Sequence, residues 1–236
     1  MMLDGQVALV AGATGVIGSA VVAALRRAGA TVATHGRRTC EGVFSADLTE
    51  PDAAGKLVRA VTARHGAPSI LVNLVHPRFT PAPLLDGDWA AHWLPNFTGG
   101  LMPALALTQA VVPTMQALRY GRIVHVSGGL SARAARGCAA YSAAKAALNM
   151  LARTTALECG SSCITVNIVA PGEVRAQDVP HDPAYDAVNV GQRATQAMPG
   201  IARPDDVAAA ILFFVDPSAR FVTGQTLFVN GGQVMP

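Results

Sequence analysis

The sequence is poor in charged residues, in aromatic side chains and in lysine. Of its 236 residues only 14% are charged and 5% are aromatic, whereas 51% are hydrophobic. This balance argues against an intrinsically disordered chain and favours a well-buried globular core. The length suits one large domain or at most two small ones.

Long uninterrupted apolar runs are also missing, and none reaches the roughly 18 residues of a membrane span. The N-terminus, MMLDGQVALV, has no basic region before its apolar stretch, so it does not have the pattern of a signal peptide. We therefore expect a cytoplasmic protein with no membrane partner. The formal charge of +3 is spread over scattered arginines, with no basic block, so we also expect no nucleic acid partner.

Cysteine is scarce, and its spacing argues against a metal site. Cys159 and Cys163 enclose three residues and have no histidine at metal-ligand spacing. We expect the four cysteines to be free thiols in a reducing compartment, and we expect no metal.

Lysine is scarcer still, because Lys56 and Lys145 are the only lysines among 18 basic residues. Lysine readily shifts its pKa, whereas arginine does not lose its proton in a protein.

Short apolar runs alternate with helical patterns along the whole chain. Strands that alternate with helices need crossover connections. The pattern therefore predicts an α/β fold with a Rossmann-type, doubly wound, mostly parallel sheet of about seven strands and helices on both faces. We expect a single domain over 1–236 with a substrate lid at 176–200, for which a plain surface loop is the alternative. The expected strands are 6–12, 30–36, 42–48, 69–75, 121–128, 164–172 and 225–232, and the expected helices are 16–29, 53–66, 89–118, 141–158 and 204–215.

The first strand runs into the stretch VALVAGATGVIG, which places Gly12, Gly15 and Gly18 between a strand and a helix. Glycine permits a tight turn and the close approach of a phosphate, and a helix N-terminus offers free N–H groups to a pyrophosphate. The alternative is a glycine turn that only lets the helix pack closely. We expect a dinucleotide site, because the triplet stands in the strand–turn–helix context that this mechanism needs.

The end of the second strand indicates which dinucleotide binds. An NAD site usually has an acidic residue there, whereas an arginine accommodates the 2′-phosphate of NADP. The chain reads TVATHGRRTC, with no acid and with Arg37 and Arg38. Because a guanidinium matches phosphate geometry, we expect NADP(H), with Asp47 and Leu48 beside the adenine. A pair of exposed loop arginines is the alternative. The link from Arg38 to Asp47 is too short for a helix.

Taken together, the chain resembles the short-chain dehydrogenase/reductase family, particularly single-domain members such as the β-ketoacyl-carrier-protein reductases. The resemblance covers nearly the whole length and rests on AGATGVIG, ILVN, YSAAK, VNIVAPG and TGQTLFVNGG, together with Asn96. It implies an NADP(H)-dependent, ketoreductase-like oxidoreductase acting on a small-molecule or carrier-bound carbonyl. It also implies a homotetramer or homodimer, joined through the long helices after Asn96 and from Tyr141.

In YSAAK, Tyr141 and Lys145 stand four residues apart, so on a helix they share a face. A neighbouring ammonium favours the phenolate form of a tyrosine, whose ordinary pKa is about 10. Tyr141 can then exchange a proton with a carbonyl oxygen as hydride reaches the carbon. The alternative makes Tyr141 a packing residue and Lys145 a surface charge. By resemblance, Lys145 also binds the nicotinamide ribose, Asn96 supports a proton relay, and further cofactor contacts fall on Thr14, Ile17, Asn73, Pro171, Gly172 and Val174.

The residue that normally donates a hydrogen bond to the substrate carbonyl is missing. The family's catalytic serine lies thirteen residues before the tyrosine, where this chain has Gly128. Losing one such donor can cost about 10²–10³ in rate. Ser127, Ser131 and His76 are the candidates to replace it. Adjacent side chains of an extended strand point to opposite faces, so Ser127 would need a local twist.

Other positions also depart from the family pattern. Ala176 stands where a threonine usually meets the nicotinamide amide, and the helix of Asn96 is about one turn longer than usual. Two alternatives to a ketoreductase therefore stay open. One is a catalytically impaired family member that binds nucleotide as a partner protein. The other is a non-redox enzyme of the dehydratase or cyclase type that uses Tyr141 without net hydride transfer.

Overall fold

The computed structural model describes residues 1–77, 79–176, 190–191 and 193–235. Its centre is a seven-stranded sheet in the order β3-β2-β1-β4-β5-β6-β7, and every neighbouring pair is parallel. This topology confirms the predicted Rossmann-type, doubly wound sheet. The strands are β1 (Val7–Ala11), β2 (Thr31–Gly36), β3 (Val43–Ser45), β4 (Ile70–Asn73), β5 (Gly121–Val126), β6 (Ile164–Pro171) and β7 (Thr226–Val229).

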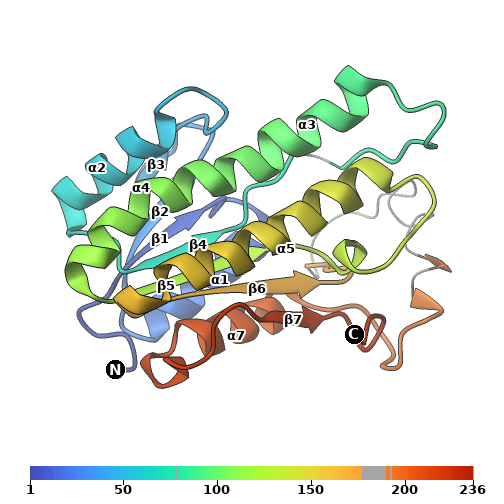
Figure 1. Ribbon diagram of the computed structural model, residues 1–236. Coiled ribbons are helices and arrows are strands. Elements are labelled where there is room, and N and C mark those ends of the chain that lie inside the picture. The colour runs from blue at the N-terminus through green and yellow to red at the C-terminus, as the bar shows by residue number, and fades with distance from the viewer. Residues whose placement is uncertain (78, 177–189, 192, 236) are drawn as a thin grey trace.

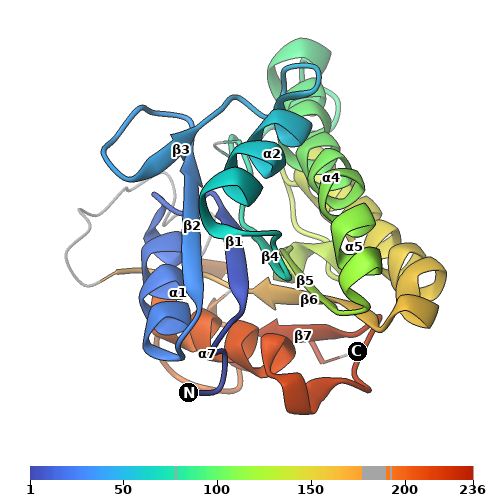
Figure 2. The same ribbon diagram turned by 90° about the vertical axis from the view of Figure 1, so that its left-hand side faces the viewer.

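Helices cover both faces of this sheet (Figures 1 and 2). Helices α1 and α7 pack on one face, and α2, α4 and α5 pack on the other. The central strands are therefore buried on both sides, and all eight residues of β6 are buried. This explains why the strands appear in the sequence as continuous apolar runs without polar alternation. The helices are α1 (Val16–Arg27), α2 (Ala53–His65), α3 (Leu94–Asn96), α4 (Met102–Leu118), α5 (Ala139–Cys159) and α7 (Pro204–Val215).

The tract expected as one helix over 89–118 is helical but not uniform. Two π-helical turns, Trp89–Trp93 and Phe97–Leu101, lie on either side of α3, and the regular helix α4 follows. By length and composition, Trp89–Leu118 is long and apolar enough to cross a membrane. In this fold, however, α4 packs against α2 and β5, and its inward side chains are fully buried, as in a core helix.

The smaller expectations have mixed outcomes. Described residues 37–42 form no helix, as the short link predicted. Helix α5 begins at Ala139, two residues earlier than expected, so Tyr141 lies in its first turn. The four cysteines, which all belong to the described residues, are free thiols. Most of the expected lid at 176–200, namely 177–189 and 192, lies outside the described residues.

Candidate active site

Two neighbouring cavities open at the carboxyl edge of the sheet, where the strand order reverses between β1 and β4. The larger has a volume of about 380 Å³ and the smaller about 280 Å³. Both are lined by Gly12, Gly15, Leu74 and His76, so they meet beside the glycine turn. Open α/β sheets bind ligands at this switch point, and the paired cavities offer an elongated groove there.

The glycine turn forms the middle of this groove. Gly12 has a φ of +81°, which a side chain would strain, and a Cβ on Gly18 would lie 2.7 Å from the Ala13 carbonyl. Gly15 caps α1 without a side-chain hydrogen bond, and no acidic residue occupies the first turn of this helix. The first N–H groups of α1 therefore have no side-chain cap and face no carboxylate from their own first turn, which fits a pyrophosphate.

One end of the groove carries the residues expected around the adenosine. Thr14, Arg37, Asp47 and Leu48 line the smaller cavity, whereas Arg38 lines neither cavity. Hydrogen bonds from the Thr49 backbone and side chain lower the pKa of the Asp47 carboxyl, and the Arg37 charge adds to this effect. Arg37 is exposed and stays available for an anion at the cavity mouth.

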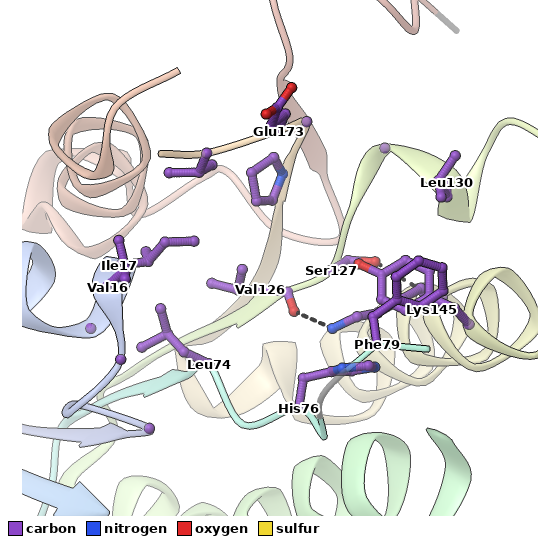
Figure 3. Close-up of a pocket in the computed structure, with 18 of the residues that line it drawn as sticks. Val16, Ile17, Leu74, His76, Phe79, Val126, Ser127, Leu130, Lys145 and Glu173 are labelled. Carbon is purple, nitrogen blue, oxygen red and sulfur yellow. Dashed lines mark hydrogen bonds between the residues drawn. The ribbon is translucent and has the colours of Figure 1, made fainter. Parts of the chain in front are cut away.

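The other end of the groove holds the tyrosine and the lysine. Lys145 is only 5% exposed, and its Nζ donates a 3.0 Å hydrogen bond to the Val126 carbonyl (Figure 3). Burial lowers the pKa of this ammonium to about 7. The Tyr141 ring centroid lies 5.8 Å from Nζ. The rings of His76 and Phe79 each lie 5.0 Å from the Tyr141 ring in edge-on contact.

The Tyr141 hydroxyl lies close to the place where the side chain of the serine expected from the resemblance would start. The backbone of Gly128 is extended, and a Cβ added there would lie 2.5 Å from the Tyr141 oxygen. Ser127 lines the larger cavity, but its hydroxyl donates to the Lys145 carbonyl over 3.3 Å. Ser131 does not line this cavity, and its oxygen accepts a 2.9 Å bond from Asn149.

The two expected asparagines lie outside both cavities. Asn96 is buried and donates a 2.6 Å hydrogen bond to the His92 carbonyl. It borders a separate small cavity together with Tyr141. Asn73 accepts a 3.0 Å bond from the Val75 N–H and so fixes the end of β4. The remaining expected cofactor contacts do line the larger cavity, namely Gly12, Gly15, Ile17, Gly18, Pro171, Gly172 and Val174.

Some residues of the site were not predicted from the sequence. Glu173 lines the larger cavity, and its buried carboxylate pairs with Arg175 at 3.0 Å and Arg193 at 2.8 Å. Its place directly after the VAPG strand end is a signal that could have identified it. Phe79 had no such signal. Among the described residues, no group of three His, Cys, Asp or Glu side chains could hold a metal ion.

Comparison with known proteins identifies the family. The family described as enoyl-(acyl carrier protein) reductase matches residues 11–233. A solved short-chain type dehydrogenase/reductase from Mycobacterium ulcerans superposes with a TM-score of 0.91 at 26% identity, covering 99% of this chain and 91% of the other. The chain belongs to the short-chain dehydrogenase/reductase family.

Among short-chain dehydrogenases/reductases, several relatives match this chain over its full length. The 3-oxoacyl-(acyl-carrier-protein) reductase FabG of Vibrio cholerae serotype O1 is 33% identical, covering 100% of both chains. The acetoacetyl-CoA reductase of Allochromatium vinosum is 30% identical over 98% of this chain and 99% of its own. A gluconate 5-dehydrogenase of Burkholderia cenocepacia, solved with NADP and tartrate, has a TM-score of 0.87 at 26% identity, covering 98% and 96%. These matches confirm the resemblance seen in the motifs.

Proposed function

We propose that the protein is an NADP(H)-dependent, ketoreductase-like oxidoreductase that interconverts a carbonyl and an alcohol. The observation that carries the proposal is the placement of Tyr141 and Lys145 in one cavity, which continues past the glycine turn to Arg37. The printed activities of the Vibrio and Allochromatium relatives, and the NADP bound by the Burkholderia structure, support it.

The groove fits NADP(H) along its length. The glycine turn and the start of α1 would hold the pyrophosphate, and Arg37 would face the 2′-phosphate. Lys145 would bind the nicotinamide ribose, and Pro171 and Val174 would flank the nicotinamide. When bound, this cofactor supplies or accepts the hydride.

The protein's own residues would handle the proton. The Tyr141 hydroxyl gives a proton to the carbonyl oxygen in reduction and takes it back in the reverse direction. The Lys145 ammonium, oriented by the Val126 carbonyl, stabilises the phenolate that is left. Leu74 and Phe79 contribute to the apolar wall that keeps water from the reacting atoms (Figure 3).

We extend the proposal to substrate, assembly and location. The substrate is a small-molecule or carrier-bound carbonyl, and a single domain over 1–236 acts in the cytoplasm. The protein forms a homodimer or homotetramer through its long helices. On α5, Met150 and Leu157 stand seven residues apart and are 57% and 86% exposed, which favours a partner on this helix. Sedimentation equilibrium, with Leu157→Glu as the disrupting variant, tests this assembly.

The deciding experiment follows NADPH oxidation against a panel of ketones, quinones and β-ketoacyl thioesters. Tyr141→Phe should lower kcat about 10²–10⁴-fold, because it removes the proton donor, while NADPH still binds. Tyr120→Phe is the matched control, because the buried Tyr120 hydroxyl has no hydrogen-bond partner among the described residues. Tyr120 lies directly before β5, and it lines neither cavity of the groove. Equal activity in the Tyr141→Phe protein and the parent would refute the assignment.

Gly128 favours a second candidate, a protein that binds the nucleotide without turning it over. Gly128 has a hydrogen atom where the usual serine has its side chain, and the Tyr141 oxygen lies beside this position. In that case the parent would bind NADPH and oxidise none of it with any of the carbonyl compounds. Conversion of a compound without NADPH consumption would instead identify a non-redox enzyme.

A further inference from the structure

His76 has a fixed ring orientation that leaves one nitrogen as an acceptor. Its Nδ1 lies 2.6 Å from the Pro77 carbonyl oxygen, which can only accept a hydrogen bond, so Nδ1 carries the proton. Burial, with a smaller contribution from the Lys145 charge, lowers the pKa of His76 to about 3, so the ring is neutral near pH 7. The buried Nε2 then carries a lone pair that has no hydrogen-bond donor among the described residues.

Two glycines of the π-helical turn Phe97–Leu101 make room for His76 and the proline that follows it. A Cβ on Gly100 would lie 3.1 Å from His76 Cδ2 and 3.3 Å from Nε2, and a Cβ on Gly99 would lie 3.4 Å from the Pro77 ring. The Tyr141 ring contacts His76 from another side, at 5.0 Å and 69°. The imidazole is therefore seated between the helical turn and the tyrosine, and His76 lines the larger cavity from this position.

Within the described residues, Lys145 has more hydrogen-bond donors than acceptors to receive them, whereas His76 has an acceptor without a donor. An ammonium carries three N–H groups, and the Val126 carbonyl accepts one of them at 3.0 Å. No acidic side chain pairs with this buried ammonium among the described residues, and His76 lines the same cavity. Figure 3 shows both side chains on the same side of the pocket. A buried donor and a buried acceptor each favour a hydrogen-bond partner.

The other titratable groups around Lys145 are already engaged. On β5, the two ring nitrogens of His125 each contact a neighbouring side chain at 3.4 Å, and burial lowers the pKa of this histidine to about 4. Glu173 lines the cavity, but its carboxylate pairs with two arginines. Tyr141, on α5 with Lys145, is the proton donor of the proposed reaction. Among the described titratable groups that line this cavity, His76 is the acceptor that remains.

We propose that His76 is the positioning residue of Lys145: its Nε2 accepts a hydrogen bond from one water molecule that in turn accepts a hydrogen bond from the ammonium, and this bridge keeps the lysine charged beside Tyr141. In this arrangement Asn96, which borders the other small cavity, does not serve Lys145. The relevance to catalysis rests on the proposed function, but the contact itself does not.

The direction in which the pKa of Lys145 should change follows from the chemistry of its contact with His76. An acceptor facing an ammonium stabilises its charged form and opposes the lowering of the pKa by burial. Removing that acceptor should lower the pKa of Lys145 further. His76→Leu deletes the acceptor, whereas His76→Gln keeps an amide oxygen at a similar reach. Asn96→Leu is the control for loss of a buried polar side chain nearby.

Because the chain contains only two lysines, the pKa of Lys145 can be measured directly by NMR. With lysine labelled at Cε with ¹³C, the spectrum contains Lys56 and Lys145 alone, and Lys56→Arg assigns them. We expect His76→Leu to lower the pKa of Lys145 by about one unit, and His76→Gln and Asn96→Leu to leave it near the parent value. An unchanged pKa in His76→Leu, or a shift produced by Asn96→Leu alone, would overturn the proposal.

Two further readouts separate this inference from the proposed function. ¹⁵N spectra of the parent should show His76 protonated at Nδ1 and bare at Nε2; the opposite tautomer would overturn the inference even if no variant folds. In a protein that oxidises NADPH, the alkaline limb of the kcat/KM profile should move to lower pH in His76→Leu and not in His76→Gln. A uniform loss of rate in both variants, with no shift of the limb, would indicate a structural role only. Absent turnover would count against the ketoreductase and would leave the NMR result intact.

Discussion

The absence of a side chain at Gly128 leaves space that the Tyr141 hydroxyl uses. Because the Tyr141 oxygen lies 2.5 Å from the position of a Cβ, a serine at this site must displace the hydroxyl that transfers the proton. We expect Gly128→Ser and Gly128→Ala to lower kcat by about 10²-fold, the cost of an ångström of misplacement, with NADPH affinity maintained. Steady-state kinetics and a fluorescence titration measure the two quantities. A Gly128→Ser protein that is faster than the parent would show that Tyr141 adjusts and that the serine is useful.

Arg37 and Arg38 are adjacent in the sequence but differ in their place on the groove. Arg37 lines the smaller cavity and Arg38 does not. A charge-assisted hydrogen bond to phosphate is worth about 1.5–3 kcal/mol, so Arg37→Ala should weaken NADPH binding about tenfold or more. NADH binding should stay nearly constant in this variant, and Arg38→Ala should affect neither cofactor. Equal losses for NADPH and NADH would mean that Arg37 does not contact the 2′-phosphate.

Part of the candidate site follows from local sequence and part does not. The i, i+4 spacing of Tyr141 and Lys145 and the glycine turn depend on geometry within one helix or one turn, so the sequence predicts them. The position of His76 depends on Gly100, which belongs to a different element and contacts the imidazole only in the fold. Spacing along the chain carries no information on such a contact, so His76 could be interpreted only as a candidate donor, whereas its tautomer makes it an acceptor.

At the scale of elements, the sheet was predictable and the interior of the long helix was not. Buried parallel strands leave an apolar run and a closing glycine, and these signals located all seven strands to within a few residues. The tract 89–118 shows a helical pattern throughout, yet it contains two π-helical turns. The second of these turns contains Gly99 and Gly100, which pack against Pro77 and His76, and helical periodicity does not report this tertiary packing.

The junction of β1 and α1 gives a prediction about an element. Gly18 lies in the first turn of α1, and a Cβ there would come within 2.7 Å of the Ala13 carbonyl oxygen, which is backbone and cannot rotate away. Gly18→Ala should therefore reduce the free energy of unfolding by about 1–3 kcal/mol, the usual cost of overpacking, and weaken NADPH binding. Urea unfolding measures the first effect. Gly160→Ala, where a Cβ has open space, is the control and should be close to neutral. Similar losses in both variants would exclude the steric explanation.

The whole molecule carries a pH dependence that originates in its buried histidines. His125 is fully buried, and burial lowers its pKa from 6.5 to about 4; His76 is lowered in the same direction. Between pH 7 and 5 the unfolded chain takes up protons at these rings and the folded protein does not. The stability that the two histidines contribute is therefore fully present above pH 6.5 and falls as the solution is acidified.

For His125 alone the loss between pH 7 and pH 5 should be about 2 kcal/mol, and it depends little on the folded pKa as long as this lies below 5. The depressed carboxyl pKa values of Asp47 and Asp216 have their effect only at lower pH. Lys145, whose pKa is lowered to about 7, adds a smaller loss in the same direction, so the comparison of variants is what isolates His125. Urea unfolding at pH 7, 6 and 5 measures the slope. His125→Asn should lower stability at pH 7, because it disturbs the contacts with Asn73 and Thr108, and should also flatten the slope. A slope equal to that of the parent would mean that His125 takes up its proton in the folded protein, and that its burial does not set the acid limit of stability.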